Sequence, residues 1–308
     1  MRVLVVGAGV TGLTVAVCLA EAGHQVDVVA RDLPLETTSA VAAALWYPYL
    51  VQPAGRVMGW AAASLGVFTE LSSVKGTGVR MVAGTELLSA PTADPPWAAV
   101  LPDFSRESEV SAPYVAGWSF TVPVIEMPIY LQWLRQRLLA AEATLTRLAL
   151  TALPERADLM VVNCAGLGAR QLAADPDVIP VQGQVVRVQQ VGLSRWTLDG
   201  TAPTYVVPRS KDIIVGGTDI QAKWSTRPDQ TVAADILARA RRLVPQLHAA
   251  AVLGHLVGLR PVRPVVRLEK SPAAAGQVIH CYGHGGAGVT LSWGCAGEVL
   301  QLVEQHVR

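Results

Sequence analysis

The stretch VLVVGAGVTG at residues 3–12 limits the possible folds of this chain more than any other. Four apolar residues lead into Gly7, Gly9 and Gly12, and a helix-like pattern follows. A buried strand, a tight glycine turn and a helix N-terminus form an anion site from backbone N–H groups, and the helix dipole favours a phosphate there. The glycines allow the turn, the approach of the phosphate and the packing of helix on strand. This context favours nucleotide binding over a chance glycine turn.

Composition narrows the class of protein further. The 308 residues are 51% hydrophobic and 16% charged, which is typical of a compact globular chain with room for two lobes. The net charge of +1 and the absence of basic runs argue against nucleic acid or an anionic membrane as partners. No apolar run approaches the roughly 20 residues of a membrane span, and the first strand leaves no room for a signal peptide. Four cysteines without a CxxC pair indicate free thiols and predict a cytoplasmic location.

The order of apolar patterns predicts an α/β chain in which two lobes alternate. We expect strands at 25–29, 121–126, 159–164, 183–191, 204–208, 212–218, 252–263 and 278–282. Helices are predicted at 13–22, 128–143, 235–247 and 289–307, with a small-residue helix between residues 39 and 46. The helix at 128–143 should bury Tyr130, Leu131, Leu134, Leu138 and Leu139. Residues 53–121 are rich in prolines and turns and suggest an inserted β-rich lobe.

The end of the second strand leaves the identity of the dinucleotide open. It is followed by Arg31 and Asp32, of which the acidic residue fits an adenosine ribose and the arginine fits a 2′-phosphate. Thr37, Thr38 and Ser39 come next and either cap a packed helix or donate to a second phosphate. A second glycine turn follows the strand at 159–164, which suggests one parallel sheet serving one extended cofactor.

The segment GLRPVRP at 258–264 contains the first candidate for substrate binding. Arg260 and Arg263 each precede a proline, so both should be extended, and their spacing of three directs them to different faces. A guanidinium on a stiff strand suits bidentate recognition of a carboxylate, which favours a functional role for Arg260. Arg267 beside Glu269 is expected to form a structural ion pair instead.

Two further segments contain candidate residues. Tyr205 begins a strand and either directs its hydroxyl into a cleft or packs as an ordinary sheet aromatic. His280 and His284 stand four apart, but glycines interrupt the segment and no cysteine or carboxylate stands at a suitable ligand spacing, so no metal is expected. No hydrolytic machinery is evident, so a bound redox cofactor would have to supply the chemistry.

Together these pieces resemble the D-amino-acid oxidase family almost from end to end. The resemblance is carried by VGAGVTGL, TTSAVAAALWYPY, VVNCAGLGAR, PVQGQVVRV, YVVPRSKDIIVGGT, GLRPVRPVVRLE and HCYGHGGAGVTLSWGCA. It implies a Rossmann-like FAD-binding domain of the glutathione-reductase type, interleaved with an antiparallel β-rich substrate domain. The FAD-binding domain would comprise 1–55, 125–178 and 256–308, and the substrate domain 56–124 and 179–255.

The resemblance also assigns residues to a non-covalent FAD and to a substrate. The pyrophosphate would be held by Gly7, Ala8, Gly9, Val10, Thr11 and Gly12. The adenosine ribose would be held by Arg31 and Asp32, with Ala149 at the adenine. The remaining cofactor contacts would come from Thr37, Thr38, Ser39, Ala44, Leu45, Gly283, Gly285, Gly286, Val289 and Thr290. Arg260 and Tyr205 would hold the substrate carboxylate, and the carbonyl of Gly286 would accept from the α-amine. The implied reaction is hydride transfer from Cα to flavin N5, with a 2-oxo acid, ammonia and hydrogen peroxide as products and O₂ as the acceptor.

Departures from the family pattern predict a particular substrate range. Asp219 stands near the place of an arginine in the D-aspartate oxidase branch, so neutral or basic D-amino acids are expected. The segment 184–205 is short and carries Thr201 in place of a lid tyrosine, which predicts an open pocket. Tyr47 and Ala287 also depart from the pattern and leave the pocket's shape open. The alternatives are a D-aspartate or glycine oxidase, an NADP-dependent reductase, and a non-catalytic flavin protein; a homodimer is left open.

Overall fold

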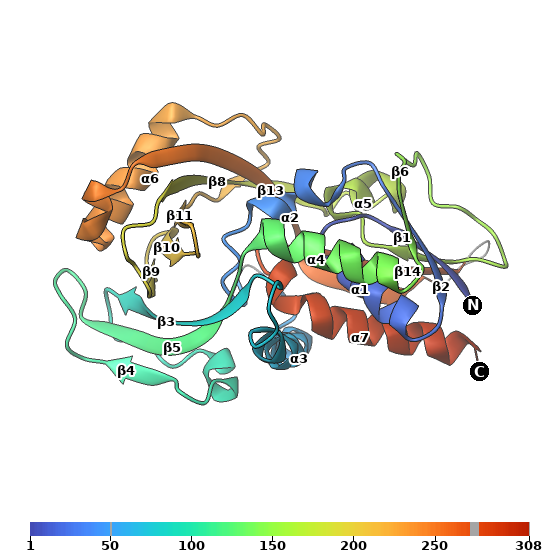
Figure 1. Ribbon diagram of the computed structural model, residues 1–308, viewed down its shortest axis with the longest axis horizontal. Coiled ribbons are helices and arrows are strands. Elements are labelled where there is room, and N and C mark those ends of the chain that lie inside the picture. The colour runs from blue at the N-terminus through green and yellow to red at the C-terminus, as the bar shows by residue number, and fades with distance from the viewer. Residues whose placement is uncertain (50, 272–276, 308) are drawn as a thin grey trace.

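The computed structural model describes residues 1–49, 51–271 and 277–307 as two lobes joined by one long sheet (Figure 1). The fourteen strands of these residues belong to a single sheet. Both ends of the chain lie in the same lobe, at the right of the view. The lobe at the right contains the parallel strands expected of the predicted nucleotide lobe, which is the name used for it below. The lobe at the left contains mostly antiparallel strands.

The nucleotide lobe contains a five-stranded parallel sheet. Its strands lie in the order β14, β7, β1, β2 and β6. Their bounds are β1 Arg2–Val6, β2 Gln25–Ala30, β6 Thr144–Arg147, β7 Met160–Asn163 and β14 Gln277–His284. Helices α1 Val10–Glu21, α4 Met127–Ala140 and α7 Gly288–Val307 pack beside it, with α1 against both α4 and α7. Because the central strands are covered, β7 is buried at every position, as the unbroken apolar run predicts.

The second lobe is mostly antiparallel. Its strands are β3 Val79–Leu88, β4 Ser105–Glu107, β5 Ala116–Ile125, β8 Ile179–Gln189, β9 Trp196–Asp199, β10 Thr204–Pro208, β11 Asp212–Gly216 and β12 Ile220–Gln221. Helix α6 Gln230–Leu243 covers β8, β10 and β11, and the carboxylate of Asp229 caps it by accepting from the N–H groups of Thr231 and Val232. The one parallel pairing in this lobe joins β3 to β9.

Strand β13, Val252–Lys270, connects the lobes. Its first half pairs with β8 and its second half with β14, so one strand carries the sheet from the substrate side to the nucleotide side (Figure 1). The short helices are α2 Thr38–Val41, α5 Ala169–Leu172 and the 3-10 turns Pro34–Glu36, Pro96–Val100, Gly166–Gly168 and Pro245–Ala249. The predicted fold class is confirmed, while the predicted domain boundaries stay a prediction.

Three local predictions are wrong. Residues 53–121 are not solely β-rich, because α3, Ala54–Leu71, buries an amphipathic face against α7. The small-residue helix ends at Val41, and the chain is extended beyond it because Leu45 bridges to Val124 of β5. Leu139 is 44% exposed, since it lies on the outer side of α4 beyond Leu138.

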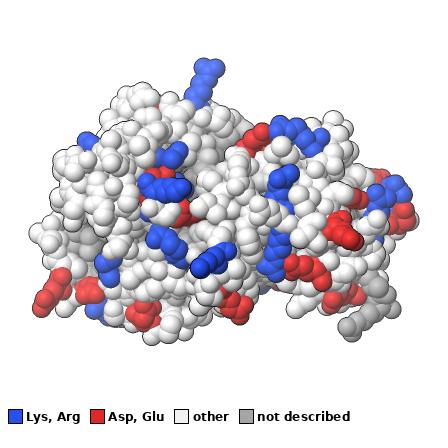
Figure 2. Space-filling view, in the orientation of Figure 1, with Lys and Arg blue, Asp and Glu red and all other residues white. Residues whose placement is uncertain are grey.

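Charges are sparse and mixed over the face seen in Figure 2, without a large patch of one sign. This agrees with the near-zero net charge. Among the described residues, no helix is both long and apolar enough to cross a membrane.

Candidate active site

One cavity of about 930 Å³ runs between the first glycine turn and the start of β10. Its volume lies within the range of cofactor and ligand sites. Of the predicted site residues it is lined by Gly7, Ala8, Gly9, Val10, Thr11, Arg31, Asp32, Thr37, Thr38, Ser39, Ala44, Leu45, Ala149, Tyr205, Arg260, Gly285, Gly286, Val289 and Thr290. Residues assigned to cofactor and to substrate therefore face one continuous space, although they come from distant parts of the sequence.

The glycine turn after β1 is shaped by close backbone contacts. Gly7 has a φ of +116°, and a Cβ atom there would collide with the carbonyl of Cys164. A Cβ on Gly12 would collide with the carbonyl of Gly7. Gly12 does not line the cavity, so its role is to let α1 pack on the turn. The turn thereby presents backbone, not side chains, to a ligand.

A serine hydroxyl lies at the start of α1, where the sequence predicts a phosphate. The N–H of Val10 donates to Oγ of Ser39 at 3.0 Å, and a Cβ on Gly9 would lie 3.2 Å from the same oxygen. An oxygen acceptor at a helix N-terminus fits the favourable end of the dipole. The hydroxyls of Thr37 and Thr38 differ, because they donate to the carbonyls of Pro34 and Leu259.

The end of the cavity where the sequence predicts the adenosine includes an ion pair between two neighbouring residues. Nη2 of Arg31 lies 2.7 Å from Oδ2 of Asp32, and the arginine side chain is largely exposed. Ala149 lines the same end, just beyond the end of β6. Arg31 donates to both carboxylate oxygens of Asp32, which fixes this carboxylate at the wall of the cavity.

The N-terminus of α7 closes the cavity from the other side. Thr290 Oγ1 donates to the carbonyl of Tyr47 and accepts from its N–H, both at 3.1 Å, which ties this helix to the segment after α2. Gly285, Gly286 and Val289 line the cavity beside it. Gly283 does not line the cavity. It has a φ of +82°, and a Cβ atom there would lie 2.8 Å from Cβ of Arg263.

Strand β13 directs Arg260 and Arg263 to different sides, as predicted. Arg260 Nη1 donates to the carbonyl of Thr218 at 2.8 Å and to Oδ1 of Asp219 at 2.6 Å. Arg263 Nε instead donates to the buried Asp175 at 2.9 Å. Both bonds of Arg260 use Nη1, and the guanidinium packs against Gly183, where a Cβ atom would lie 2.5 Å from Nη2 and 2.7 Å from Nη1. The predicted structural pair of Arg267 with the Glu269 carboxylate is confirmed at 2.8 Å.

Tyr205 and Tyr49 stand beside this guanidinium. Burial raises the pKa of Tyr205, so its hydroxyl stays protonated and can donate. Tyr49 donates to Oδ2 of Asp219, and burial followed by this bond raises its pKa as well. The side chain of Asp219 is 23% exposed and lines the cavity, so it faces the pocket as the substrate prediction requires.

The sequence did not reveal Glu86, which also lines the cavity. This residue of β3 is 4% exposed, and Tyr47 donates to its Oε2 at 2.9 Å. Burial, the largest effect, raises the pKa of Glu86 to about 7. The sequence offered one indication of its position: in the alternating pattern of strand β3, Glu86 falls on the same inward face as Val82, Gly84 and Leu88.

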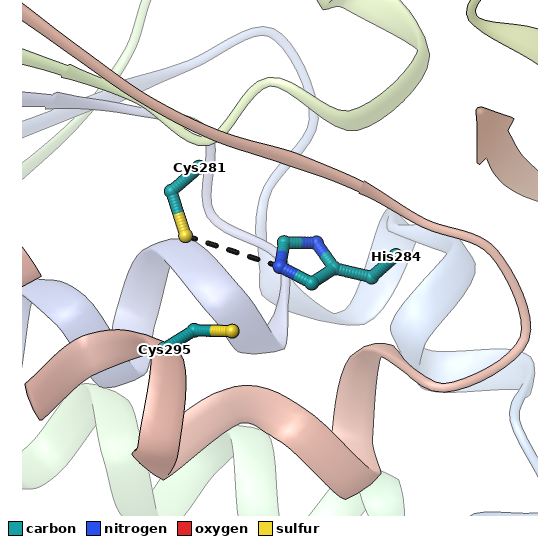
Figure 3. Close-up of side chains that lie close together, drawn as sticks. All are labelled: Cys281, His284 and Cys295. Atoms are coloured by element: carbon teal, nitrogen blue, oxygen red, sulfur yellow. Dashed lines mark hydrogen bonds between the residues drawn. The ribbon is translucent and has the colours of Figure 1, made fainter. Parts of the chain in front are cut away.

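A buried thiol–imidazole cluster lies under the glycine-rich segment (Figure 3). Possible ligand atoms of Cys281, His284 and Cys295 lie within 4.8 Å of one another, and Sγ of Cys281 is 3.9 Å from Nε2 of His284. The expectation that no cysteine stands at a suitable spacing is therefore wrong, because α7 returns Cys295 against β14. His280 is not part of the cluster and contacts Asn163. Hydrogen bonding, first from Cys164 and then from Cys295, lowers the pKa of Cys281.

The fold and the cavity define a class of protein: a two-lobed α/β enzyme in which Arg260 of the connecting strand β13 and Tyr205 of the second lobe line one cavity with the glycine turn of β1. The model of the family described as "FAD dependent oxidoreductase" matches residues 2–302. The chain belongs to this family, which includes D-amino-acid oxidases, and the resemblance drawn from the sequence is confirmed. FAD is accordingly the cofactor, and the NADP-dependent alternative is set aside.

Individual relatives agree with this membership. The chain is 48% identical to a D-amino-acid oxidase of Rubrobacter xylanophilus, with 98% of this chain and 95% of that protein covered. It is 45% identical to a D-amino-acid oxidase of Streptomyces coelicolor, with coverage of 98% and 96%. The crystal structure of a glycine oxidase from Geobacillus kaustophilus superposes with a TM-score of 0.84 over 99% of this chain and 95% of that chain. That structure is 19% identical, so it supports the fold alone.

Proposed function

We propose that this protein is a D-amino-acid oxidase, which converts a D-amino acid, O₂ and water to a 2-oxo acid, ammonia and hydrogen peroxide. The observation that supports this most is the single cavity, which joins the glycine turn of β1 to Arg260 and Tyr205. When bound, FAD supplies the acceptor for a hydride from the substrate Cα and passes the electrons to O₂. The protein's own residues then need to bind and orient the substrate.

The substrate carboxylate is held by Arg260. Asp219 and the carbonyl of Thr218 engage Nη1 and fix the plane of the guanidinium, so its remaining donors can form a charge-assisted bond with a carboxylate. The neutral hydroxyl of Tyr205 donates to the same carboxylate, and its elevated pKa prevents a repulsive phenolate at that place. Gly286 lies beside them, where a Cβ atom would come within 2.9 Å of the ring of Tyr49 and 3.7 Å of Cδ of Arg260, and it would offer its carbonyl to the α-amine.

This three-point hold selects the D configuration by geometry. With carboxylate and amine fixed, only one enantiomer directs its Cα–H toward the cofactor side of the cavity. No side-chain base is required for this step, because the hydrogen leaves Cα with its electron pair and the ammonium gives its extra proton to water beforehand. The role of each site residue is part of the proposal.

Asp219 supports a preference for neutral or basic substrates. Its carboxylate lies beside Arg260 in the cavity and offsets the positive charge there. A second carboxylate on the substrate would meet this acidic group instead of an arginine, and like charges in a partly buried site repel. D-Aspartate and D-glutamate should therefore be poor substrates.

A panel of substrates with peroxide detection tests the proposal. D-Methionine and D-lysine should give peroxide, while L-methionine should give none and D-aspartate and D-glutamate much less. Equal turnover of D-aspartate and D-methionine would contradict the role of Asp219. Peroxide from glycine alone would favour the glycine oxidase alternative. A cytoplasmic location and a homodimeric assembly remain sequence-based proposals.

A further inference from the structure

Glu86 stands out in the cavity as a buried carboxylate without a cationic partner among the described residues. Its one hydrogen-bond donor is the neutral hydroxyl of Tyr47, at 2.9 Å from Oε2 and 3.2 Å from Oε1. Other acidic groups of the cavity are better satisfied: Asp219 pairs with Arg260, and Asp199 accepts from Tyr114 and Thr201. Burying a carboxylate without a counter-charge costs stability, so its position calls for a ligand that compensates it.

The carboxylate of Glu86 lies where the cavity widens. Glu86 and Tyr47 line both the main cavity and an adjoining one of about 430 Å³, whose wall includes Trp118 and Gly200. A Cβ atom on Gly200 would lie 2.9 Å from Oε1 of Glu86. The glycine therefore lets its backbone pack closely beside the carboxylate, which still lines both cavities and is within reach of a ligand from there.

The sheet register fixes the distance from Glu86 to the substrate-binding tyrosine. Glu86 of β3 stands opposite Leu198 of β9, and Leu198 stands opposite Tyr205 of β10. Directly opposed residues share one face of a sheet, and neighbouring strands are about 4.8 Å apart. The backbones at Glu86 and Tyr205 are therefore roughly 10 Å apart, with both side chains on the cavity face.

This separation matches a long cationic side chain. A substrate whose carboxylate is held at Tyr205 and Arg260 would extend its side chain past Leu198, and a four-carbon stem with an ammonium spans about 6 Å. The wall along that path includes the side chain of Leu198 and the ring of Tyr47. Such a wall suits the methylenes of lysine or arginine, whose charged head then needs an anion at the far end.

We propose that Glu86 is the side-chain subsite for the cationic group of a basic D-amino acid, such as D-lysine or D-arginine. This inference rests on the proposed oxidase function and narrows its substrate class. The ammonium or guanidinium would lie between the carboxylate of Glu86 and the ring of Tyr47, whose hydroxyl keeps the carboxylate in place. Asp219 acts at the other end, where it orients Arg260.

The groups around Glu86 predict how the affinity of this subsite for a cationic side chain depends on pH. The Tyr47 hydroxyl stays neutral because burial raises its pKa, and the nearby Asp199 adds negative charge. Since the pKa of Glu86 is raised to about 7, the carboxylate is mostly protonated at pH 6 and mostly charged at pH 8. Binding of a cation should therefore strengthen across this interval, whereas binding of a neutral analogue should not.

Competitive inhibition of the FAD-loaded enzyme tests the subsite without requiring turnover of the probe. The probe 6-aminohexanoate is lysine without its α-amine, and hexanoate also lacks the terminal ammonium. With D-methionine as substrate, and with the shift of the flavin absorption as a direct binding signal, 6-aminohexanoate should bind about 10- to 100-fold more tightly than hexanoate at pH 8. The Glu86→Gln variant should lose this ratio.

A matched control and a second variant keep the test decisive. Glu70→Gln removes an exposed carboxylate from α3 and should leave the ratio as in the wild type. If Glu86→Gln does not fold, Glu86→Asp keeps the charge on a shorter stem and should reduce the ratio, and the wild-type ratio should still rise from pH 6 to pH 8. An unchanged ratio in Glu86→Gln, or a pH-independent ratio in the wild type, would overturn the subsite. Failure of the wild type to oxidise D-methionine would instead refute the oxidase function on which it rests.

Discussion

The two ends of the cavity are built in different ways. At the cofactor end, backbone groups face the ligand, and Gly7 and Ser39 shape the start of α1 through contacts over short distances. At the substrate end, side chains face the ligand, and Glu86, Tyr205 and Arg260 come from three strands that are far apart in sequence. The comparison indicates that cofactor binding should be sensitive to added atoms, whereas substrate selection should be sensitive to removed charges.

The largest effect is expected from an added methyl group at the cofactor end. Gly7→Ala places Cβ against the carbonyl of Cys164 in a conformation with positive φ, so the turn must move. We expect purified Gly7→Ala protein to carry little or no flavin by absorption after gel filtration. Gly55→Ala is the control, because a Cβ there meets open space in α3. Normal flavin content in the Gly7→Ala variant would contradict the proposed role of the backbone turn in binding the cofactor.

The next largest effect is expected from the removal of a charge at the substrate end. Arg260→Ala deletes the carboxylate partner, and a buried charge-assisted pair is worth about 2–5 kcal/mol. KM for D-methionine should rise by roughly two to three orders of magnitude, while flavin content stays normal. Arg263→Ala provides the comparison on the same strand, since it contacts Asp175 outside the cavity and should lower thermal stability without changing KM. A wild-type KM in Arg260→Ala would contradict the account.

A methyl group at the substrate end should have a smaller effect than one at the cofactor end. In Gly183→Ala the new Cβ would lie 2.5 Å from Nη2 of Arg260, but a long side chain can shift where a backbone carbonyl cannot. We expect KM to rise by about tenfold for all D-amino acids, because the guanidinium is displaced but not removed. Steady-state kinetics with D-methionine and D-lysine measure this, and different factors for the two substrates would argue against a shared carboxylate site.

The smallest expected effect concerns stability and pH. The pKa of Glu86 is about 7 in the folded chain and lies above its ordinary value, so the folded state binds this proton more tightly than the unfolded state does. Stability is therefore lost as pH rises through the interval up to about 7. Glu86→Gln should raise Tm by a few degrees at pH 8 and by less at pH 5. Equal shifts at both pH values in thermal melts would show that the charge of Glu86 costs nothing in the fold.

The same contrast explains what the sequence could predict. The glycine turn, the parallel strands and Arg260 follow from local patterns, because strand, turn and helix are adjacent in the chain and each proline restricts the residue before it. Glu86 and Cys295 could not be placed, since their neighbours are set by the pairing of β3 with β9 and by the packing of α7 on β14. Helix α3 was not predicted because nearby turn residues obscure its helical pattern of apolar residues. Helix α2 was predicted to be too long because its alanines favour a helix, whereas Leu45 pairs with Val124 in an extended conformation.

We expect one cavity to bring a D-amino acid and FAD together so that the substrate reduces the flavin directly. Anaerobic titration of the purified holoenzyme with D-methionine, followed by absorption spectroscopy, tests this most directly. D-Methionine should bleach the oxidised flavin completely, whereas L-methionine should leave the spectrum unchanged. A flavin that stays oxidised with D-methionine and D-lysine alike would contradict the claim and would indicate a flavin protein without this activity.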